Sequence, residues 1–328
     1  MRDRQMDTAS LDASTTAAEA ISGIDLHGHR ALVTGASSGI GAETVRALAS
    51  AGAEVTLAVR NVEAGKTVAA GIAARYGDER VRVTHLDLAD LGSVRAFADQ
   101  WSGPLHLLIN NAGVMALPER TLNNAGHELH FATNHLGHFA LATWMHDALA
   151  AGGHDKLAVE GPLSCARIVS LSSRGHLRAS VDFDDIDFVR RTYESFIAYG
   201  QSKTANVLFA VEAARRWSDD GITANAVHPG AILETNLSRH MTAEVLRAAT
   251  TNANGFKTTA QGAATTIVVA TSPALAGVSA RYFEDCHEAQ VLPPNTPDIA
   301  QHANGVAWYA LDANIAEKLW DISMQLIE

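Results

Sequence analysis

The sequence predicts an α/β fold in which helices cover both faces of a parallel sheet, in a doubly wound arrangement that forms a single domain. Apolar strand-like runs alternate with helix-like segments along the chain, which is typical of successive βαβ units. No linker or internal repeat interrupts this alternation. Right-handed crossovers then bring the carboxyl ends of the strands to one edge of the sheet, where ligands bind.

The length of the chain, 328 residues, suggests about two domains at roughly 150 residues per domain. The unbroken alternation instead predicts one domain over residues 26–328. Residues 1–25 contain no long apolar stretch, so they predict a flexible tail rather than a secretory signal. No segment has the ~18 consecutive apolar residues that a membrane span needs.

Short apolar runs predict the strands, and the longer segments between them predict the helices. The strands are expected over residues 31–34, 54–59, 81–84, 105–109, 167–171, 223–227 and 278–283. The helices are expected over residues 42–51, 62–76, 93–101, 131–150 and 203–217. Two segments, 174–198 and 231–257, lengthen the connections and are expected to carry substrate specificity, with 231–257 capping the substrate.

Charge and cysteine content exclude several classes of protein. The chain has 25 basic and 36 acidic residues and a net charge of −11. No run of Lys and Arg exceeds two residues, so nucleic acid is not an expected partner. Cys165 and Cys286 form no CxxC pair, which fits a reducing compartment and predicts a cytoplasmic protein.

A glycine-rich turn follows the first predicted strand. Residues 34–41 read TGASSGIG, and a predicted helix comes next. Glycine allows bare backbone to approach a pyrophosphate, and the start of a helix offers free N–H groups to it. A glycine triplet alone also marks ordinary tight turns, but between a strand and a helix it predicts dinucleotide binding.

The end of the fifth strand and the following helix carry groups suited to acid–base chemistry. Tyr199 and Lys203 are four residues apart, so a helix places them on one face. A tyrosine has an ordinary pKa near 10, and a neighbouring ammonium group is expected to lower the pKa of Tyr199 towards neutrality. Taken alone, YxxxK is common on helices; the glycine turn upstream is what favours the functional interpretation.

These motifs resemble the short-chain dehydrogenase/reductase family, which has a Rossmann-type fold. The resemblance rests on the TGxxxGxG turn, on NNAG at 110–113, on SS at 172–173, on YGQSK at 199–203 and on HPG at 228–230. The segments TNHLGHF at 133–139, YFEDC at 282–286 and WDIS at 320–323 are similar to the retinol dehydrogenase-like branch. So is the 26-residue separation between Ser173 and Tyr199.

The resemblance implies a role for each member of a catalytic group. Tyr199 exchanges a proton with the substrate oxygen, and Lys203 also holds the nicotinamide ribose. Ser173 polarises the substrate oxygen; it is preferred to Ser172 because the family's serine is usually the second of such a pair. Asn134 orders a water that links Lys203 to solvent.

The cofactor is expected to be NADP, with NAD as the alternative. No acidic residue follows the second strand to bind a ribose 2′-hydroxyl, and Arg60 stands where it can accommodate a 2′-phosphate. Thr235 lies one residue further from Gly230 than is usual in the family. The expected cofactor contacts are Gly35, Ser37, Ser38, Gly39, Ile40, Gly41, Arg60, Asp87, Leu88, Asn111, Ala112, Gly113, Tyr199, Lys203, Pro229, Gly230 and Thr235.

No catalytic metal is expected. The clustered histidines His127, His130, His135 and His138 do not form the HExxH arrangement of a helical zinc site. The acidic run at 182–187 is interpreted as a solvated turn, because carboxylates in alternation point to opposite faces of an extended chain.

The sequence therefore predicts an NAD(P)-dependent oxidoreductase that interconverts a hydroxyl and a carbonyl on an apolar small molecule. Residues that could line the substrate pocket or pack a covering helix are Leu233, Leu237, Met241 and Leu246. Two alternatives remain: a catalytically silent dinucleotide-sensing protein, and a reductase of carbon–carbon double bonds with the same fold. A homo-oligomer is possible.

Overall fold

The computed structural model describes residues 10–77, 80–157, 161–233, 235, 237 and 255–328. Within this part of the chain, the centre of the molecule is an eight-stranded sheet in the order β3-β2-β1-β4-β5-β6-β7-β8. Its strands are β1 Arg30–Thr34, β2 Glu54–Val59, β3 Val81–His85, β4 Leu107–Asn110, β5 Ala166–Leu171, β6 Ile222–His228, β7 Tyr282–Glu284 and β8 His287–Glu288.

Strands β1 to β7 are parallel to their neighbours, and only the short edge strand β8 is antiparallel. The predicted doubly wound parallel sheet in a single Rossmann-type domain is confirmed. The strand order reverses between β1 and β4, so the chain leaves these two carboxyl ends in opposite directions and opens a crevice between them.

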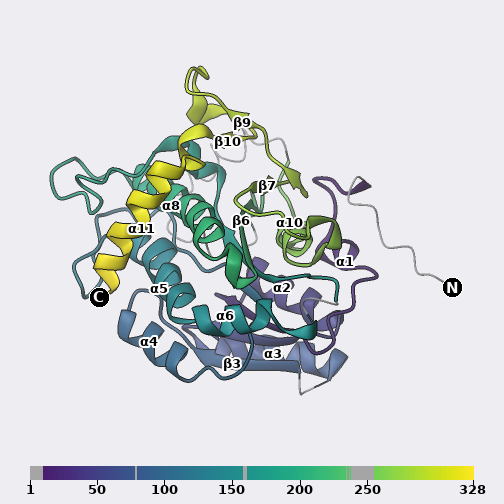
Figure 1. Cartoon of the computed structure of the whole chain (residues 1–328). Helices are drawn as coiled ribbons and strands as arrows, with labels where there is room; N and C mark the ends of the chain where they lie inside the picture. Colours follow the sequence, from purple (N-terminus) through teal and green to yellow (C-terminus); the bar gives the residue numbers. More distant parts are fainter. Residues whose placement is uncertain (1–9, 78–79, 158–160, 234, 236, 238–254) are drawn as a thin grey trace.

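Helices cover both faces of the sheet (Figure 1). They are α1 Ala17–Ala20, α2 Gly39–Ser50, α3 Val62–Tyr76, α4 Leu91–Asp99, α5 Gly137–Trp144, α6 His146–Gly153, α8 Ser195–Arg216, α10 Thr259–Thr271 and α11 Ala313–Ile327. Leu32 of β1 joins the core under α4, α5 and α8, whereas Ala31 and Val33 join the core under α2, α3 and α10. Alternate residues of a strand point to opposite faces. The apolar strand β1 therefore contributes side chains to the cores on both faces of the sheet.

The helix predicted over residues 131–150 is divided in the structure. It consists of a π-helix over Phe131–Leu136, followed by α5 and α6. A Cβ added at Gly137 would collide with the carbonyl oxygen of Leu88. Glycine at this position therefore lets the segment after β3 pass directly against α5.

The sequence did not predict α10 or α11. Nearly all of α10 is buried, and it carries several β-branched residues, so it lacks the polar stripe of a surface helix. A capping box between Thr258 and Gln261 begins it, and that pair was the signal available in the sequence. Asp312 caps α11 by accepting from the N–H groups of Asn314 and Ile315.

The flexible tail predicted for residues 1–25 is wrong from Leu11 onward. Leu11, Ala17 and Ile21 are buried and pack with residues of α10 and α2. Thr16 forms a capping box with Glu19 at the start of α1. Residues 1–9 lie outside the described residues. No helix in the described segments is both long and apolar enough to span a bilayer.

Outside the sheet, the structure has a small parallel pair of strands, β9 Val291–Leu292 and β10 Val306–Ala307. Short 3-10 helices lie at Arg174–Arg178, Ser218–Asp220, Pro273–Leu275, Ile299–Gln301 and Trp308–Ala310. The first of these follows β5 and belongs to the candidate active site.

The last helix, α11, lies across α8 (Figure 1). Trp320 of α11 is buried, and its ring lies 4.9 Å from that of Phe139 and 5.2 Å from that of Trp217, between ring centroids. Aromatic rings in this edge-to-face arrangement attract each other beyond the burial of their area. Trp320 thus joins α11 to α5 and to the residue that ends α8.

We expect Trp320→Ala to lower the free energy of unfolding by about 3–5 kcal/mol, because the substitution removes a buried aromatic side chain and leaves a cavity. Urea unfolding followed by circular dichroism measures the change. Trp308 is 38% exposed, so Trp308→Ala is the control and should cost under ~1 kcal/mol. Equal losses in the two variants would show that α11 is not anchored through Trp320.

Candidate active site

The glycine turn lies at the carboxyl end of β1. Gly35 and Gly39 have φ values of +67° and +56°, which favour glycine over other residues. A Cβ added at Gly35 would lie 2.8 Å from Cα of Ala112, and one at Gly41 would lie 2.6 Å from Nδ2 of Asn111. Because α2 begins at Gly39, its free N–H groups lie at the crevice, where a pyrophosphate would bind.

Thr34 fastens the turn to the segment after β4. Its hydroxyl oxygen accepts hydrogen bonds from the backbone N–H groups of Asn111 and Ala112, both at 2.9 Å. The side-chain amide of Asn111 donates to the carbonyl oxygen of Thr34 at 2.7 Å. The structure therefore brings together four of the predicted cofactor contacts, Gly35, Gly41, Asn111 and Ala112.

The other predicted cofactor residues lie at the carboxyl ends of neighbouring strands. Arg60 follows β2 and is exposed, while Asp87 and Leu88 follow β3. Gly113 ends the segment after β4, and Pro229 and Gly230 follow β6. A dinucleotide fits this row of strand ends, because the bare glycine backbone and the start of α2 can contact its phosphates.

Thr235 lies against the glycine turn. A Cβ added at Gly39 would be 3.3 Å from Cγ2 of Thr235. The extra residue between Gly230 and Thr235 therefore does not remove Thr235 from the cofactor crevice. Most of the predicted capping segment, including Met241 and Leu246, lies outside the described residues.

Tyr199 and Lys203 lie one turn apart on α8, and both are buried. The Nζ atom of Lys203 donates to the carbonyl oxygen of Leu171 at 3.0 Å and lies 5.7 Å from the ring centroid of Tyr199. A Cβ added at Gly113 would be 3.5 Å from the same Nζ. The side chain of Lys203 thus reaches from α8 towards the segment after β4.

The two serines after β5 have different partners. Ser172 is buried and donates to the carbonyl oxygen of Lys203 at 2.8 Å. Ser173 caps the 3-10 helix Arg174–Arg178 by accepting from the N–H of Gly175 at 3.0 Å. A Cβ added at Gly175 would lie 2.9 Å from Cε1 of Tyr199 and 3.4 Å from Oγ of Ser173, and a hydrogen bond with Ser173 opposes the effect of burial, which raises the pKa of Tyr199. Ser173 is therefore the serine that faces Tyr199.

Burial sets the pKa values of the Tyr–Lys pair. It raises the pKa of Tyr199 to about 12, against the smaller effect of Ser173. It lowers the pKa of Lys203 to about 7. The predicted lowering of the tyrosine pKa by Lys203 is therefore wrong for the protein alone, because loss of water around both groups disfavours both charged forms.

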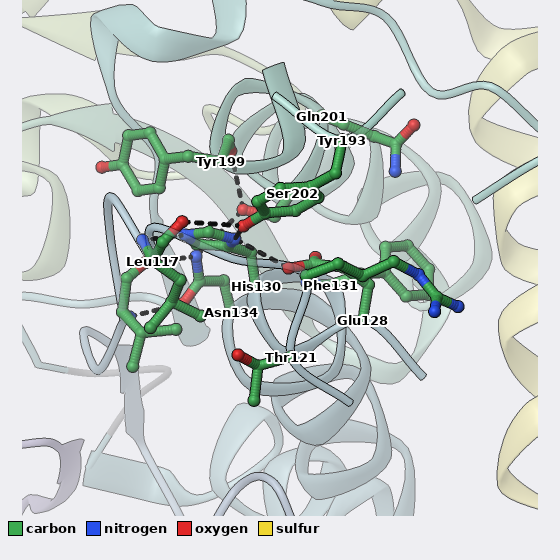
Figure 2. Close-up of polar contacts among 12 residues, drawn as sticks. Leu117, Thr121, Glu128, His130, Phe131, Asn134, Tyr193, Tyr199, Gln201 and Ser202 are labelled. Carbon is green, nitrogen blue, oxygen red and sulfur yellow. Dashed lines mark hydrogen bonds and ion pairs between the residues drawn. The ribbon is translucent and has the colours of Figure 1, made fainter. Parts of the chain in front are cut away.

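The side chain of Asn134 is fully hydrogen-bonded within the protein (Figure 2). Its Oδ1 accepts from the N–H of Val114 at 2.8 Å, and its Nδ2 donates to the carbonyl oxygen of Val114 at 3.0 Å. Nδ2 also donates to Oγ of Ser202 at 2.9 Å, and Ser202 in turn donates to the carbonyl oxygen of Tyr199 at 2.7 Å. The amide thus ties the segment after β4 to α8.

The interpretation of 182–187 as a solvated turn is wrong for two of its carboxylates. Asp185 is buried and accepts hydrogen bonds from the N–H groups of Val189, Arg190 and Arg191. Asp187 accepts from the N–H of Glu128 at 2.8 Å. The segment turns back on itself rather than running extended, so alternation of faces does not apply.

Sequence reasoning also missed Gln201, which lies between Tyr199 and Lys203 on α8. Its side chain is buried on the side of the helix away from Tyr199 (Figure 2). It accepts from Arg191 at 2.6 Å and donates to the carbonyl oxygen of Ile186 at 2.9 Å. No local pattern signals these contacts, because they depend on how the inserted segment folds back.

Among the residues that the structure describes, no group of three or more His, Cys, Asp or Glu side chains is arranged to hold a metal ion. His135 and His138 are buried, and burial lowers the pKa of each to about 3. Both are therefore neutral at physiological pH. His138 contacts Thr34 and Asn134, while His135 contacts Ser323 of α11.

Comparisons with known proteins agree with this geometry. The family described as short chain dehydrogenase matches residues 29–157. A probable oxidoreductase of Streptomyces antibioticus is 49% identical over 306 residues, covering 91% of this chain and 97% of that protein. Retinol dehydrogenase 12 of Mus musculus is 37% identical over 308 residues, covering 93% of this chain and 88% of that protein. The structure of Pseudomonas aeruginosa RhlG in its NADP active-site complex has a TM-score of 0.63 and 26% identity, covering 79% of this chain and 95% of that one.

The chain belongs to the short-chain dehydrogenase/reductase family, whose members named above are oxidoreductases. The fold and the relatives together define a dinucleotide-dependent oxidoreductase. Its similarity to the retinol dehydrogenases over nearly its whole length confirms the predicted retinol dehydrogenase-like branch.

The buried Lys203 predicts a pH-dependent free energy of unfolding for the cofactor-free protein. Its pKa is about 7 when folded, against an ordinary value of 10.5. Between these values the unfolded state binds more protons, so stability rises with pH across the window. Below pH 7 both states carry the charge, and the cost of burying it is present in full.

We therefore expect Lys203→Met to stabilise the cofactor-free protein most at low pH. The gain should shrink by up to about 1.4 kcal/mol per pH unit as the pH rises from about 7 to 10. Urea unfolding of both proteins across this range measures the difference. Lys66 is an exposed lysine of α3, and Lys66→Met should show no such trend. If the free energy of unfolding gained in Lys203→Met did not change with pH, the lowered pKa of Lys203 would be wrong.

Proposed function

We propose that this protein is an NADP-dependent oxidoreductase that interconverts a hydroxyl and a carbonyl on an apolar small molecule. The observation that carries the proposal is the meeting of Ser173, Tyr199 and Lys203 beside the glycine turn, at the carboxyl ends of β5 and β1. Ligands of a doubly wound sheet bind at the carboxyl ends of its strands. Acid and base groups at that edge can exchange a proton with a substrate that lies next to a bound dinucleotide.

In the direction of reduction, Tyr199 acts as the acid. With a pKa of about 12, its phenol is protonated at neutral pH and can donate the proton to the substrate oxygen. Ser173 holds the same oxygen through its hydroxyl and polarises the carbonyl. The nicotinamide, when bound, supplies the hydride for the carbonyl carbon. The product is an alcohol, and Tyr199 recovers its proton from solvent.

In the direction of oxidation, Tyr199 must accept the proton of the alcohol. A charged Lys203 close to the ring favours the phenolate, and its ammonium group is available below a pH of about 7 in the protein alone. The hydrogen bond to the carbonyl oxygen of Leu171 holds the lysine at this place, next to Gly113. The same charge stabilises the phenolate that remains after Tyr199 has donated its proton in the direction of reduction.

The choice of NADP rests on Arg60. It is exposed directly after β2, which pairs with β1 beside the glycine turn. A guanidinium group pairs with a phosphate through two parallel hydrogen bonds. The NADP complex of the Pseudomonas aeruginosa relative supports the same cofactor class. An apolar substrate is supported by the retinol dehydrogenases among the relatives and by the exposed side chain of Leu233.

A cytoplasmic location forms part of the proposal. Cys165 and Cys286 are both free and buried. Buried unpaired thiols suit a reducing compartment, where disulfides do not persist.

The acid–base role predicts that Tyr199→Phe lowers kcat by about 10²–10⁴-fold, because the variant lacks the proton that reduction requires. NADPH oxidation with a panel of aldehydes, ketones and enones measures turnover. The dissociation constant for NADPH should change little, since the ring remains in place. Turnover with enones alone would instead indicate reduction of carbon–carbon double bonds.

Tyr193→Phe is the matched control for this experiment. Tyr193 is a partly buried tyrosine that precedes α8, and its hydroxyl donates to the carbonyl oxygen of Leu117 at 3.1 Å. Its loss should leave kcat within about tenfold of the wild type. Wild-type turnover in Tyr199→Phe would remove the proposed mechanism. Absence of turnover in the wild type, together with NADPH binding, would favour a dinucleotide-sensing protein.

The cofactor preference predicts that Arg60→Ala weakens NADPH binding by about 10–100-fold, the loss of one or two charge-assisted hydrogen bonds. Binding of NADH should be unchanged, because it has no 2′-phosphate. Fluorescence titration of both nucleotides measures this. Arg75 lies exposed at the other end of α3, so Arg75→Ala should affect neither. Equal NADPH affinity in Arg60→Ala and the wild type would refute the NADP assignment.

A further inference from the structure

His138 joins two parts of the active site that are far apart in the sequence. It is a buried residue of α5. Its Nε2 lies 2.8 Å from the hydroxyl oxygen of Thr34, the last residue of β1 before the glycine turn. Its Nδ1 lies 2.8 Å from the backbone carbonyl oxygen of Asn134 in the π-helix.

The chemistry of the partners fixes the direction of both hydrogen bonds. A carbonyl oxygen only accepts, so Nδ1 of His138 carries the hydrogen and donates to Asn134. Burial, together with the charge of Lys203, lowers the pKa of His138 to about 3, so the ring is neutral. Nε2 must then accept, and the hydroxyl of Thr34 donates to it.

This arrangement leaves the lone pairs of the Thr34 hydroxyl free to accept from the N–H groups of Asn111 and Ala112. A directed chain of hydrogen bonds thus runs from the segment after β4, through Thr34 and His138, to the carbonyl of Asn134. The side chain of Asn134 extends this series of hydrogen bonds to Ser202 of α8. Ser202 in turn donates to the carbonyl oxygen of Tyr199. Every donor in the chain meets an acceptor.

We propose that His138 is a positioning residue that holds the glycine turn and the π-helix in a fixed relation through its two ring nitrogens. The inference rests on the proposed function for its consequence. Loss of this relation would shift the cofactor turn relative to Tyr199 and Lys203, and catalysis is sensitive to displacements of about 1 Å.

His135 provides a matched comparison. It is three residues away, equally buried and equally neutral. Its Nε2 lies 2.8 Å from Oγ of Ser323 on α11, so its hydrogen bond leads away from the cofactor crevice. A role that depended on burial alone would be the same for both histidines.

Two substitutions separate the two bonds of His138. The amide nitrogen of asparagine lies where Nδ1 lies in histidine, so His138→Asn keeps the donor to Asn134 and loses the acceptor for Thr34. The amide oxygen of glutamine can lie where Nε2 lies, so His138→Gln keeps the acceptor and loses the donor. His135→Gln is the control, and Thr34→Val with Thr34→Ser tests the same chain from its other end.

We expect His138→Asn and Thr34→Val to raise the dissociation constant for NADPH by about three- to tenfold, the equivalent of one hydrogen bond, and to lower kcat, because the glycine turn moves relative to Tyr199. Thr34→Ser should restore the wild-type value. We expect His138→Gln to lower kcat by about tenfold or more and to move the pH profile of kcat, with NADPH affinity unchanged. His135→Gln should lower the unfolding temperature and change none of these quantities.

The proposal is overturned if both His138 variants behave like His135→Gln, with lower stability but unchanged NADPH affinity and kcat. It is also overturned if Thr34→Val and Thr34→Ser bind NADPH equally well, a result that can be obtained even where the His138 variants do not fold. Failure of the proposed function can be told apart from failure of this inference. If the proposed function is wrong, the wild type has no turnover, but the NADPH affinities of the variants still test the hydrogen bonds of Thr34 and His138.

Discussion

The site depends on the close approach of the chain after β1 to the chain after β4. The sheet reverses its strand order between these two strands, so their carboxyl ends meet without a helix between them. A side chain at Gly35 would collide with Ala112, and Thr34 supplies the acceptor that the backbone of Asn111 and Ala112 needs. A glycine and a hydroxyl residue are both required here. The first two residues of the TGASSGIG turn therefore determine how closely the segments after β1 and β4 approach each other.

On the other side of the same crevice, the residues proposed to carry the chemistry lower the stability of the free protein. Tyr199 and Lys203 are removed from water, and each pKa shifts towards the neutral form of its group. Lys203 has no carboxylate partner among the residues that the structure describes, so its ammonium group is costly to bury. The carbonyl oxygen of Leu171 offsets only part of that cost. Residues that destabilise the free protein are expected where chemistry requires a perturbed pKa.

The strands and the strand-end motifs were predictable from the sequence because both are local. A buried strand shows as an apolar run, and its ligand-binding residues follow directly after it. The rest could not be predicted, because it depends on contacts between distant residues. His138 and Thr34 are 104 positions apart, and Asn134 and Ser202 are 68 apart. The pKa of Tyr199 was predicted in the wrong direction because a sequence shows neighbours but not burial.

The inserted segment between Ser173 and Tyr199, which is expected from the sequence to carry substrate specificity, is anchored apart from the Tyr199 side chain. Gln201 holds the segment from the side of α8 opposite to Tyr199, and Asp187 holds it against the residues just before the π-helix. One anchor therefore lies on α8, on a face other than that of Tyr199, and the other lies just before the π-helix. Changes within the segment can therefore occur without moving Tyr199, because α8 is fixed independently by the sheet and by α11.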